Sequence, residues 1–185
     1  MSLYRNKYRI ESARLKGWDY SNNGMYFITI CTHHKLHFFG NIVNDIMLLN
    51  DIGKVAHQFW EDIPKYSPFI ELGVFVVMPN HTHGILIIDK ENNDWRDKEP
   101  MLEIEYDPNN AKEFMSKISP KSGTISRILS SYKAAVTKQA RKIHPDYGWQ
   151  ERFHEHIIRN EESFKRIENY ILTNPENWEK DKFYG

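Results

Sequence analysis

The sequence lacks several features that mark specialised classes of protein. Cys31 is the only cysteine among the 185 residues, so no disulfide can form within the chain. No apolar run reaches membrane-spanning length, and no stretch resembles a secretory signal peptide. Together these absences predict a cytoplasmic protein that folds without covalent cross-links.

The sequence also lacks a linker rich in proline, glycine and serine that would divide it. We therefore expect a single domain over residues 1–185, with its core at about 22–175. A basic arm, 1–21, precedes the core. Residues 89–120 are acidic and aperiodic and contain several prolines, which is typical of an insertion rather than of a regular element.

Net charge is absent as well, because 25 basic residues balance 25 acidic ones. The basic residues are nevertheless unevenly spread, and many gather between 117 and 142. Lysine and arginine gathered on one surface can contact a phosphate backbone, although a solvated helix face is the alternative. The candidates for DNA contacts are Arg127, Lys133, Lys138, Arg141 and Lys142.

Periodicity of apolar residues predicts the regular elements. Alternation over Met25–His33 indicates a strand, and Phe38–Val43 is its expected partner. Helical spacing predicts three helices: from Asn50 or Asp51 to Ile63, Thr124–Ile143 and Glu161–Leu172. The order of elements favours an α+β fold, an antiparallel sheet with helices packed on it, followed by C-terminal helices.

Two further strands, 69–78 and 81–88, are separated only by Pro79 and Asn80 and should form a hairpin. Residues two apart in a strand point to the same face, so His81 and His83 would present two imidazoles side by side. Two neutral imidazoles can share a divalent cation. A pair of ordinary surface or core histidines is the alternative.

The segment M-P-N-H-T-H resembles the histidine-x-histidine signature of the HUH-type single-strand tyrosine transposases. An early Y-F-I-T-I-C-T-H strand, a late W-Q-E-R-F-H-E-H segment and Y-I-L-T-N-P extend this resemblance, which is greatest to REP-associated and insertion-sequence members. The resemblance implies a ferredoxin- or RRM-like sheet, a homodimer, and Mg²⁺ or Mn²⁺ as cofactor. It also implies cleavage and strand transfer of single-stranded DNA at hairpins through a 5′-phosphotyrosine.

The resemblance places the nucleophilic tyrosine on a helix downstream of the histidines, and Tyr132 is the candidate. Tyr132 also lies on an apolar stripe, so a core role is the alternative, and another register puts Val136 in the nucleophile's place. Tyr170, in a helix pattern with Ile167 and Ile171, is better explained by core packing.

The resemblance also implies a third metal ligand one turn after the tyrosine, where Val136 cannot coordinate a cation. The amide oxygen of Gln139 is the candidate substitute. His154 and His156 form a second His-x-His, which is read as a secondary candidate for metal or phosphate contact. Two other functions stay open: a descendant that binds hairpin DNA without cutting it, and a metal-dependent phosphodiesterase that uses activated water.

Overall fold

The computed structural model describes residues 21–90 and 123–184, and these form an α+β fold. Its centre is a four-stranded antiparallel sheet in the order β4-β5-β1-β6. The strands are β1 (Gly24–Cys31), β4 (Ile70–Met78), β5 (His81–Ile88) and β6 (His154–Ile158). The predicted fold class is confirmed, whereas the predicted basic arm and most of the acidic insertion lie outside the described residues.

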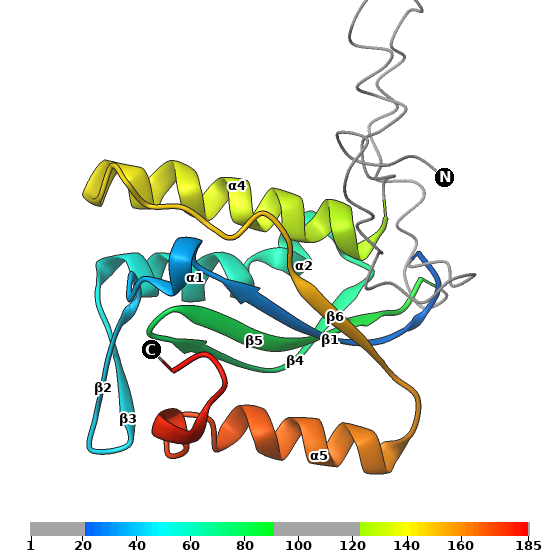
Figure 1. The fold of residues 1–185 in the computed structure, drawn as a ribbon. Helices are drawn as coiled ribbons and strands as arrows, with labels where there is room; N and C mark the ends of the chain where they lie inside the picture. Colours follow the sequence, from blue (N-terminus) through cyan, green and yellow to red (C-terminus); the bar gives the residue numbers. More distant parts are fainter. Residues whose placement is uncertain (1–20, 91–122, 185) are drawn as a thin grey trace, which may run out of the picture.

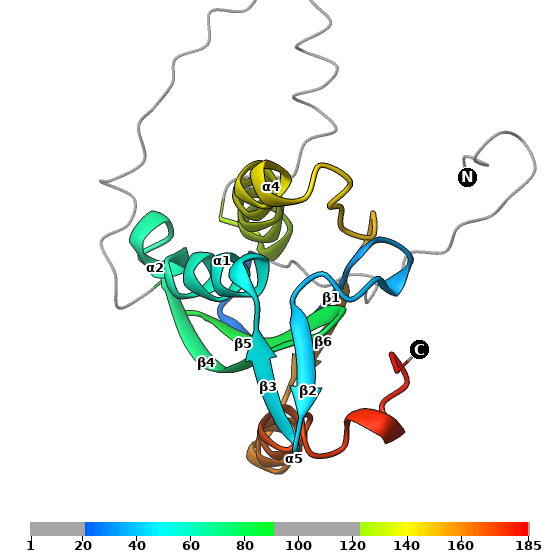
Figure 2. The same cartoon turned by 90° about the vertical axis from the view of Figure 1, so that its left-hand side faces the viewer.

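Helices cover both faces of this sheet. The helices α1 (Asp51–Glu61), α2 (Ile63–Tyr66) and α4 (Ile125–Ile143) lie on one side, and α5 (Glu161–Leu172) lies on the other (Figure 1). The view turned by 90° shows the same layers (Figure 2). Two short 3-10 turns, η1 (His33–Lys35) and η3 (Trp178–Lys180), lie in the connecting segments. None of the described helices is both long and apolar enough to cross a membrane.

Side-chain caps fix where the three longer helices begin. The side chains of Asn50, Thr124 and Asn160 accept hydrogen bonds from backbone N–H groups three residues later. These bonds satisfy donors that the first turn of a helix leaves without partners. The helix starts that the sequence predicts are therefore confirmed.

One predicted strand pairing is wrong. The strand β2 (Gly40–Val43) does not pair with β1 but with β3 (Ile46–Leu49), in a separate two-stranded sheet. Asn44 and Asp45 both have positive φ, the conformation of a tight hairpin turn, which asparagine and aspartate tolerate better than other non-glycine residues. The edge of β1 is instead occupied by β6, a strand that the sequence reading missed.

The two faces of the sheet bury different cores. Under α1 and α4 lies the larger core, to which β1 contributes Tyr26, Ile28 and Ile30. Under α5 lies a smaller core built around Ile85, Ile158, Ile167 and Ile171. Because β5 alternates, His81 and His83 share the α5 face with Ile85.

Candidate functional site

His81 and His83 lie at the start of β5, immediately after the turn that joins it to β4. Their imidazole centroids are 4.4 Å apart, and the side chains are 0% and 1% exposed. The β4–β5 hairpin was predicted from sequence and is confirmed. Its geometry brings the two rings together on the α5 face.

A third group joins them from the C-terminal segment. Asp181 follows η3, and its carboxylate together with one nitrogen of each histidine forms a cluster in which the ligand atoms all lie within 4.8 Å of one another. Two imidazoles and one carboxylate are a donor set that binds divalent cations and leaves coordination positions open for substrate. The cluster is thus compatible with a divalent metal ion.

Burial keeps the two imidazoles uncharged. It lowers the pKa of His81 to about 4, an effect that the nearby Asp181 carboxylate partly offsets. Burial also holds the pKa of His83 well below its usual value, and the neighbouring His81 adds to this shift. Both rings are therefore neutral at neutral pH, with a lone pair available for a cation.

Asn80 determines which nitrogen of His81 carries that lone pair. Its side-chain NH₂ donates to the backbone carbonyls of Lys35 and Phe183, at 3.2 and 2.9 Å, so its Oδ1 must face His81. Oδ1 lies 2.8 Å from His81 Nδ1, which is accordingly the protonated nitrogen. His81 Nε2 is left buried and without a hydrogen-bond partner among the described residues, as a metal ligand requires.

His83 is held by a hydroxyl on each side. Thr29 Oγ1 lies 2.8 Å from His83 Nδ1, and Tyr170 Oη lies 3.1 Å from His83 Nε2. Since a threonine hydroxyl can donate or accept, the bond to Thr29 is compatible with either tautomer of His83. In the tautomer protonated on Nδ1, Nε2 carries the lone pair that a metal ligand requires.

Tyr170 reaches from α5 to the candidate metal centre formed by His81, His83 and Asp181. Its hydroxyl donates to Asp181 Oδ2 at 2.9 Å, and its ring is 36% exposed and packs edge-on against Phe27. Burial raises the pKa of the phenol, and the neighbouring Asp181 carboxylate raises it further. A positive charge at the cluster would act in the opposite direction and favour the phenolate.

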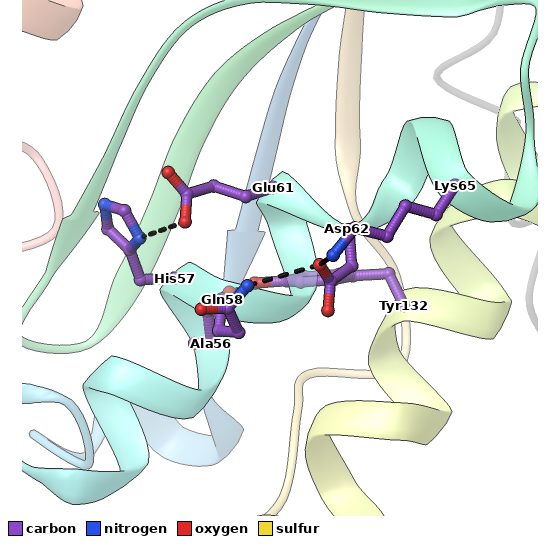
Figure 3. Close-up of polar contacts among 7 residues, drawn as sticks. All are labelled: Ala56, His57, Gln58, Glu61, Asp62, Lys65 and Tyr132. Carbon is purple, nitrogen blue, oxygen red and sulfur yellow. Dashed lines mark hydrogen bonds and ion pairs between the residues drawn. The ribbon is translucent and has the colours of Figure 1, made fainter.

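The structure does not bring Tyr132 to the histidines. Tyr132 lies in the core between α1 and α4, is 3% exposed, and donates from its hydroxyl to the carbonyl of Ala56 at 3.1 Å. Figure 3 shows the side chain extending from α4 towards Ala56 on α1. Burial raises the pKa of this phenol, and the sheet separates its helix from the centre.

Gln139 lies on α4 as well, and therefore on the other side of the sheet from the histidine pair. So do the five predicted DNA contacts, Arg127, Lys133, Lys138, Arg141 and Lys142. Lys133, Lys138 and Arg141 line a hollow of about 510 Å³ between α4 and the segment around Trp149. Lys133 and Arg141 also donate to backbone carbonyls of that segment, at Gln150 and Tyr147.

His154 and His156 lie on β6, an edge strand. His154 pairs in register with Thr29 and His156 with Phe27, so both histidines share the α5 face with the centre. Neither belongs to a metal-ligating cluster of three groups in the part of the chain that the structure describes. The second His-x-His thus flanks the first across β1.

Sequence reasoning missed two groups of the centre. Asp181 lies in an irregular segment with no periodic signal, far along the chain from the histidines. Tyr170 was assigned to packing because apolar residues surround it in the helix. The segment Y-I-L-T-N-P, which carries part of the family resemblance and begins with Tyr170, is the signal that could have identified it.

Comparison with known proteins gives one clear relative. No protein-family model matches the chain. Similar solved structures are a REP-associated tyrosine transposase bound to a REP hairpin and a Deinococcus radiodurans R1 protein described as a candidate transposase. The first has 21% identity and a TM-score of 0.49, over 98% of this chain and 77% of that one. The second has 14% identity and a TM-score of 0.41, over 86% of this chain and 95% of that one.

The relative found by sequence is an uncharacterized protein of Haemophilus influenzae, 39% identical over 177 residues, which cover 94% of this chain and 92% of the relative. Identity of this extent over nearly the whole of both chains shows common descent, and the chain belongs to the family of that Haemophilus influenzae protein.

Proposed function

We propose that this protein cleaves and rejoins single-stranded DNA, with Tyr170 as the nucleophile and His81, His83 and Asp181 as ligands of Mg²⁺ or Mn²⁺. One observation carries the proposal. The Tyr170 hydroxyl lies within hydrogen-bond distance of two members of the candidate metal cluster, His83 Nε2 and Asp181 Oδ2. The family resemblance of the sequence motifs supports the same chemistry.

The residues of the cluster suit a divalent cation. His81 Nε2 is a buried nitrogen without a hydrogen-bond partner among the described residues, and the donor set joins two neutral imidazoles to a carboxylate. When bound, the cation would polarise the scissile phosphate and favour the phenolate of Tyr170. We propose Asp181 in place of Gln139 as the third ligand, because α4 lies across the sheet.

In the proposed step, Tyr170 Oη attacks the phosphorus atom. The bond from Oη to phosphorus forms, and the bond from phosphorus to the 3′ oxygen breaks. The phenolic proton passes to Asp181 Oδ2, which already accepts a hydrogen bond from it, and then to the leaving 3′ oxygen. The products are a 5′-phosphotyrosine and a 3′-hydroxyl, and the reverse reaction with another 3′-hydroxyl transfers the strand.

The basic surface of α4 is the proposed site for the duplex part of a hairpin. Lys138 and Lys142 are exposed, and Lys133 and Arg141 border the same hollow. Such a surface holds a phosphate backbone without reading its sequence. It lies across the sheet from the centre, so a hairpin and its adjoining single strand would contact different sides of the protein.

The test is incubation of the protein with labelled hairpin DNAs carrying single-stranded ends, in Mn²⁺, followed by a denaturing gel. We expect a protein-linked 5′ product from the wild type and from Tyr132→Phe, and none from Tyr170→Phe or His81→Ala. Tyr132→Phe is the matched control, because it removes a phenolic hydroxyl on the opposite side of the sheet.

Each other outcome contradicts the proposal in a specific way. Cleavage that survives Tyr170→Phe but not His81→Ala would indicate a phosphodiesterase that uses water. Loss of the covalent product in Tyr132→Phe alone would return the nucleophile to α4. Hairpin binding without cleavage by the wild type would indicate a binding protein that has lost nuclease activity.

A further inference from the structure

A second polar hollow lies on the α5 side of the molecule, apart from the metal cluster. Its volume is about 390 Å³, and it opens between the end of β6 and the first turns of α5. The polar side chains that line it are those of His156, Arg159, Asn160, Glu162, Ser163 and Arg166. This set is rich in hydrogen-bond donors and has one carboxylate.

The positive charges of Arg159 and Arg166, the two arginines of this hollow, are not neutralised by an ion pair among the described residues. Arg166 makes one long hydrogen bond, 3.4 Å, to Ser163 Oγ, and within residues 21–90 and 123–184 neither arginine forms an ion pair. A guanidinium presents several N–H donors in a planar fork that matches two oxygens of a phosphate. An exposed pair of such groups beside a hollow suits a phosphate diester.

The position of Arg166 relative to Tyr170 is set by the helix α5, on which both residues lie. Arg166 precedes the tyrosine by four residues on α5, so the two side chains lie on the same face of the helix, about 6 Å apart along its axis. Neighbouring phosphates of an extended nucleic-acid strand are separated by a comparable distance. A strand whose phosphate meets Tyr170 can thus bring another phosphate to Arg166.

The two histidines of β6, His154 and His156, lie between the metal cluster and the hollow. Thr29 is hydrogen-bonded to His83 in the centre and pairs in register with His154 on the neighbouring strand. His156 follows two residues later on the same face and lines the hollow. Polar side chains therefore extend from the metal cluster across β1 and β6 to the hollow.

We propose that the hollow formed by His156, Arg159, Ser163 and Arg166 binds a backbone phosphate of the single DNA strand, next to the phosphate that Tyr170 attacks. This inference rests on the proposed function, whose substrate it positions. It assigns to the second His-x-His a role in guiding the strand rather than in holding a metal.

The first test measures strand binding without metal and without cleavage. Labelled oligothymidylate is titrated with protein at several salt concentrations, using wild type, the double variant Arg159→Gln/Arg166→Gln, and Lys165→Gln. Lys165 is the matched control, because it lies on the same helix but pairs with Glu161. Loss of one phosphate contact lowers the slope of log affinity against log salt by about 0.7.

We expect that decrease, together with a several-fold weaker affinity, in the double variant alone. An unchanged slope, or an equal change in Lys165→Gln, would overturn the inference. Both arginines are exposed, so the variants should fold, and their thermal unfolding midpoints provide the check. The result does not depend on whether the protein cuts DNA, so failure here is distinct from failure of the proposed chemistry.

The second test locates the phosphate. Once a cleavage position is mapped, single phosphates around it are replaced by neutral methylphosphonates. We expect one replacement next to the cut to weaken binding of the wild type but to have little further effect in the double variant, the signature of direct coupling. Equal effects of that replacement in both proteins would place the contact elsewhere.

Discussion

The two faces of the sheet each receive a tyrosine from a helix, but the surroundings of the two phenols differ. Tyr132 is enclosed between α1 and α4, where its hydroxyl bonds a backbone carbonyl. Tyr170 is partly exposed, and its hydroxyl faces an imidazole and a carboxylate. Both lie on helices that follow the histidines in sequence. In the proposed function, the groups around the phenolic oxygen, and not the position of its helix, distinguish the nucleophilic tyrosine from the structural one.

The largest effect should follow removal of a proposed metal ligand on the α5 face. We expect His83→Ala to weaken Mn²⁺ binding by about 100-fold or more, because the cluster loses one of three donors and loss of a group that only orients a ligand already costs about 10- to 100-fold. His57→Ala is the control, because His57 lies on α1 beside Glu61, on the other face. Calorimetric titration with Mn²⁺ measures both variants. Equal losses of Mn²⁺ affinity in the two variants would contradict the assignment of metal binding to the α5 face alone.

Asn80→Ala should have the next largest effect. The substitution removes the acceptor that fixes the proton of His81 on Nδ1, and it releases the carbonyl of Phe183. Loss of such an orienting partner weakens metal binding by about 10- to 100-fold. The control is Asn177→Ala, which removes an exposed amide that donates to the backbone carbonyl of Thr173 in the turn between α5 and η3. Wild-type Mn²⁺ affinity in Asn80→Ala would show that the histidine needs no orientation.

On the α1 face the expected effects are on stability. A Cβ at Gly84 would lie 2.4 Å from Cζ2 of the buried Trp60 and 3.0 Å from Cβ of Phe75. Forcing an atom into such a core costs about 1–3 kcal/mol, so Gly84→Ala should unfold at lower denaturant concentration. Gly148→Ala, whose Cβ would meet only His33 at 3.5 Å, should leave the free energy of unfolding nearly unchanged. Similar midpoints for the two variants would contradict this description of the core.

The smallest effect should come from Tyr132→Phe. It removes one buried hydrogen bond, to the carbonyl of Ala56, and should lower the free energy of unfolding by about 1 kcal/mol. Mn²⁺ affinity should remain at the wild-type value. Denaturant unfolding and Mn²⁺ titration of the same preparation check the two parts. A loss of Mn²⁺ affinity in this variant would contradict the prediction, because it would mean that a residue on the α1 face affects the metal cluster on the α5 face.

Local patterns made much of the fold predictable. Alternation and a two-residue turn gave the β4–β5 hairpin, and helical spacing with a capping asparagine gave α5 over Glu161–Leu172. The pairing of β2 was mispredicted because adjacency in sequence was taken for pairing, although Asn44-Asp45 is itself a turn signal. Periodicity indicates which residues form a strand or helix, but not which other strand it pairs with.

The centre was only half predictable for a related reason. His81 and His83 are neighbours in one strand, so their proximity follows from strand geometry. Asp181 and Tyr170 meet them only through tertiary packing of α5 and of the segment after η3. Helical spacing marked Tyr170 as a neighbour of core residues, which is true of its ring, but spacing carries no information about what its hydroxyl faces.

The position of Asp181 so late in the chain has a consequence for biosynthesis. The strands β1, β4 and β5 have all been synthesised once residue 88 has been made. The Asp181 carboxylate, and the Phe183 carbonyl to which Asn80 donates, come more than ninety residues later. A nascent chain can therefore contain both histidines and still have no complete centre. The proposed DNA-cutting chemistry would begin only after residue 183 has left the ribosome.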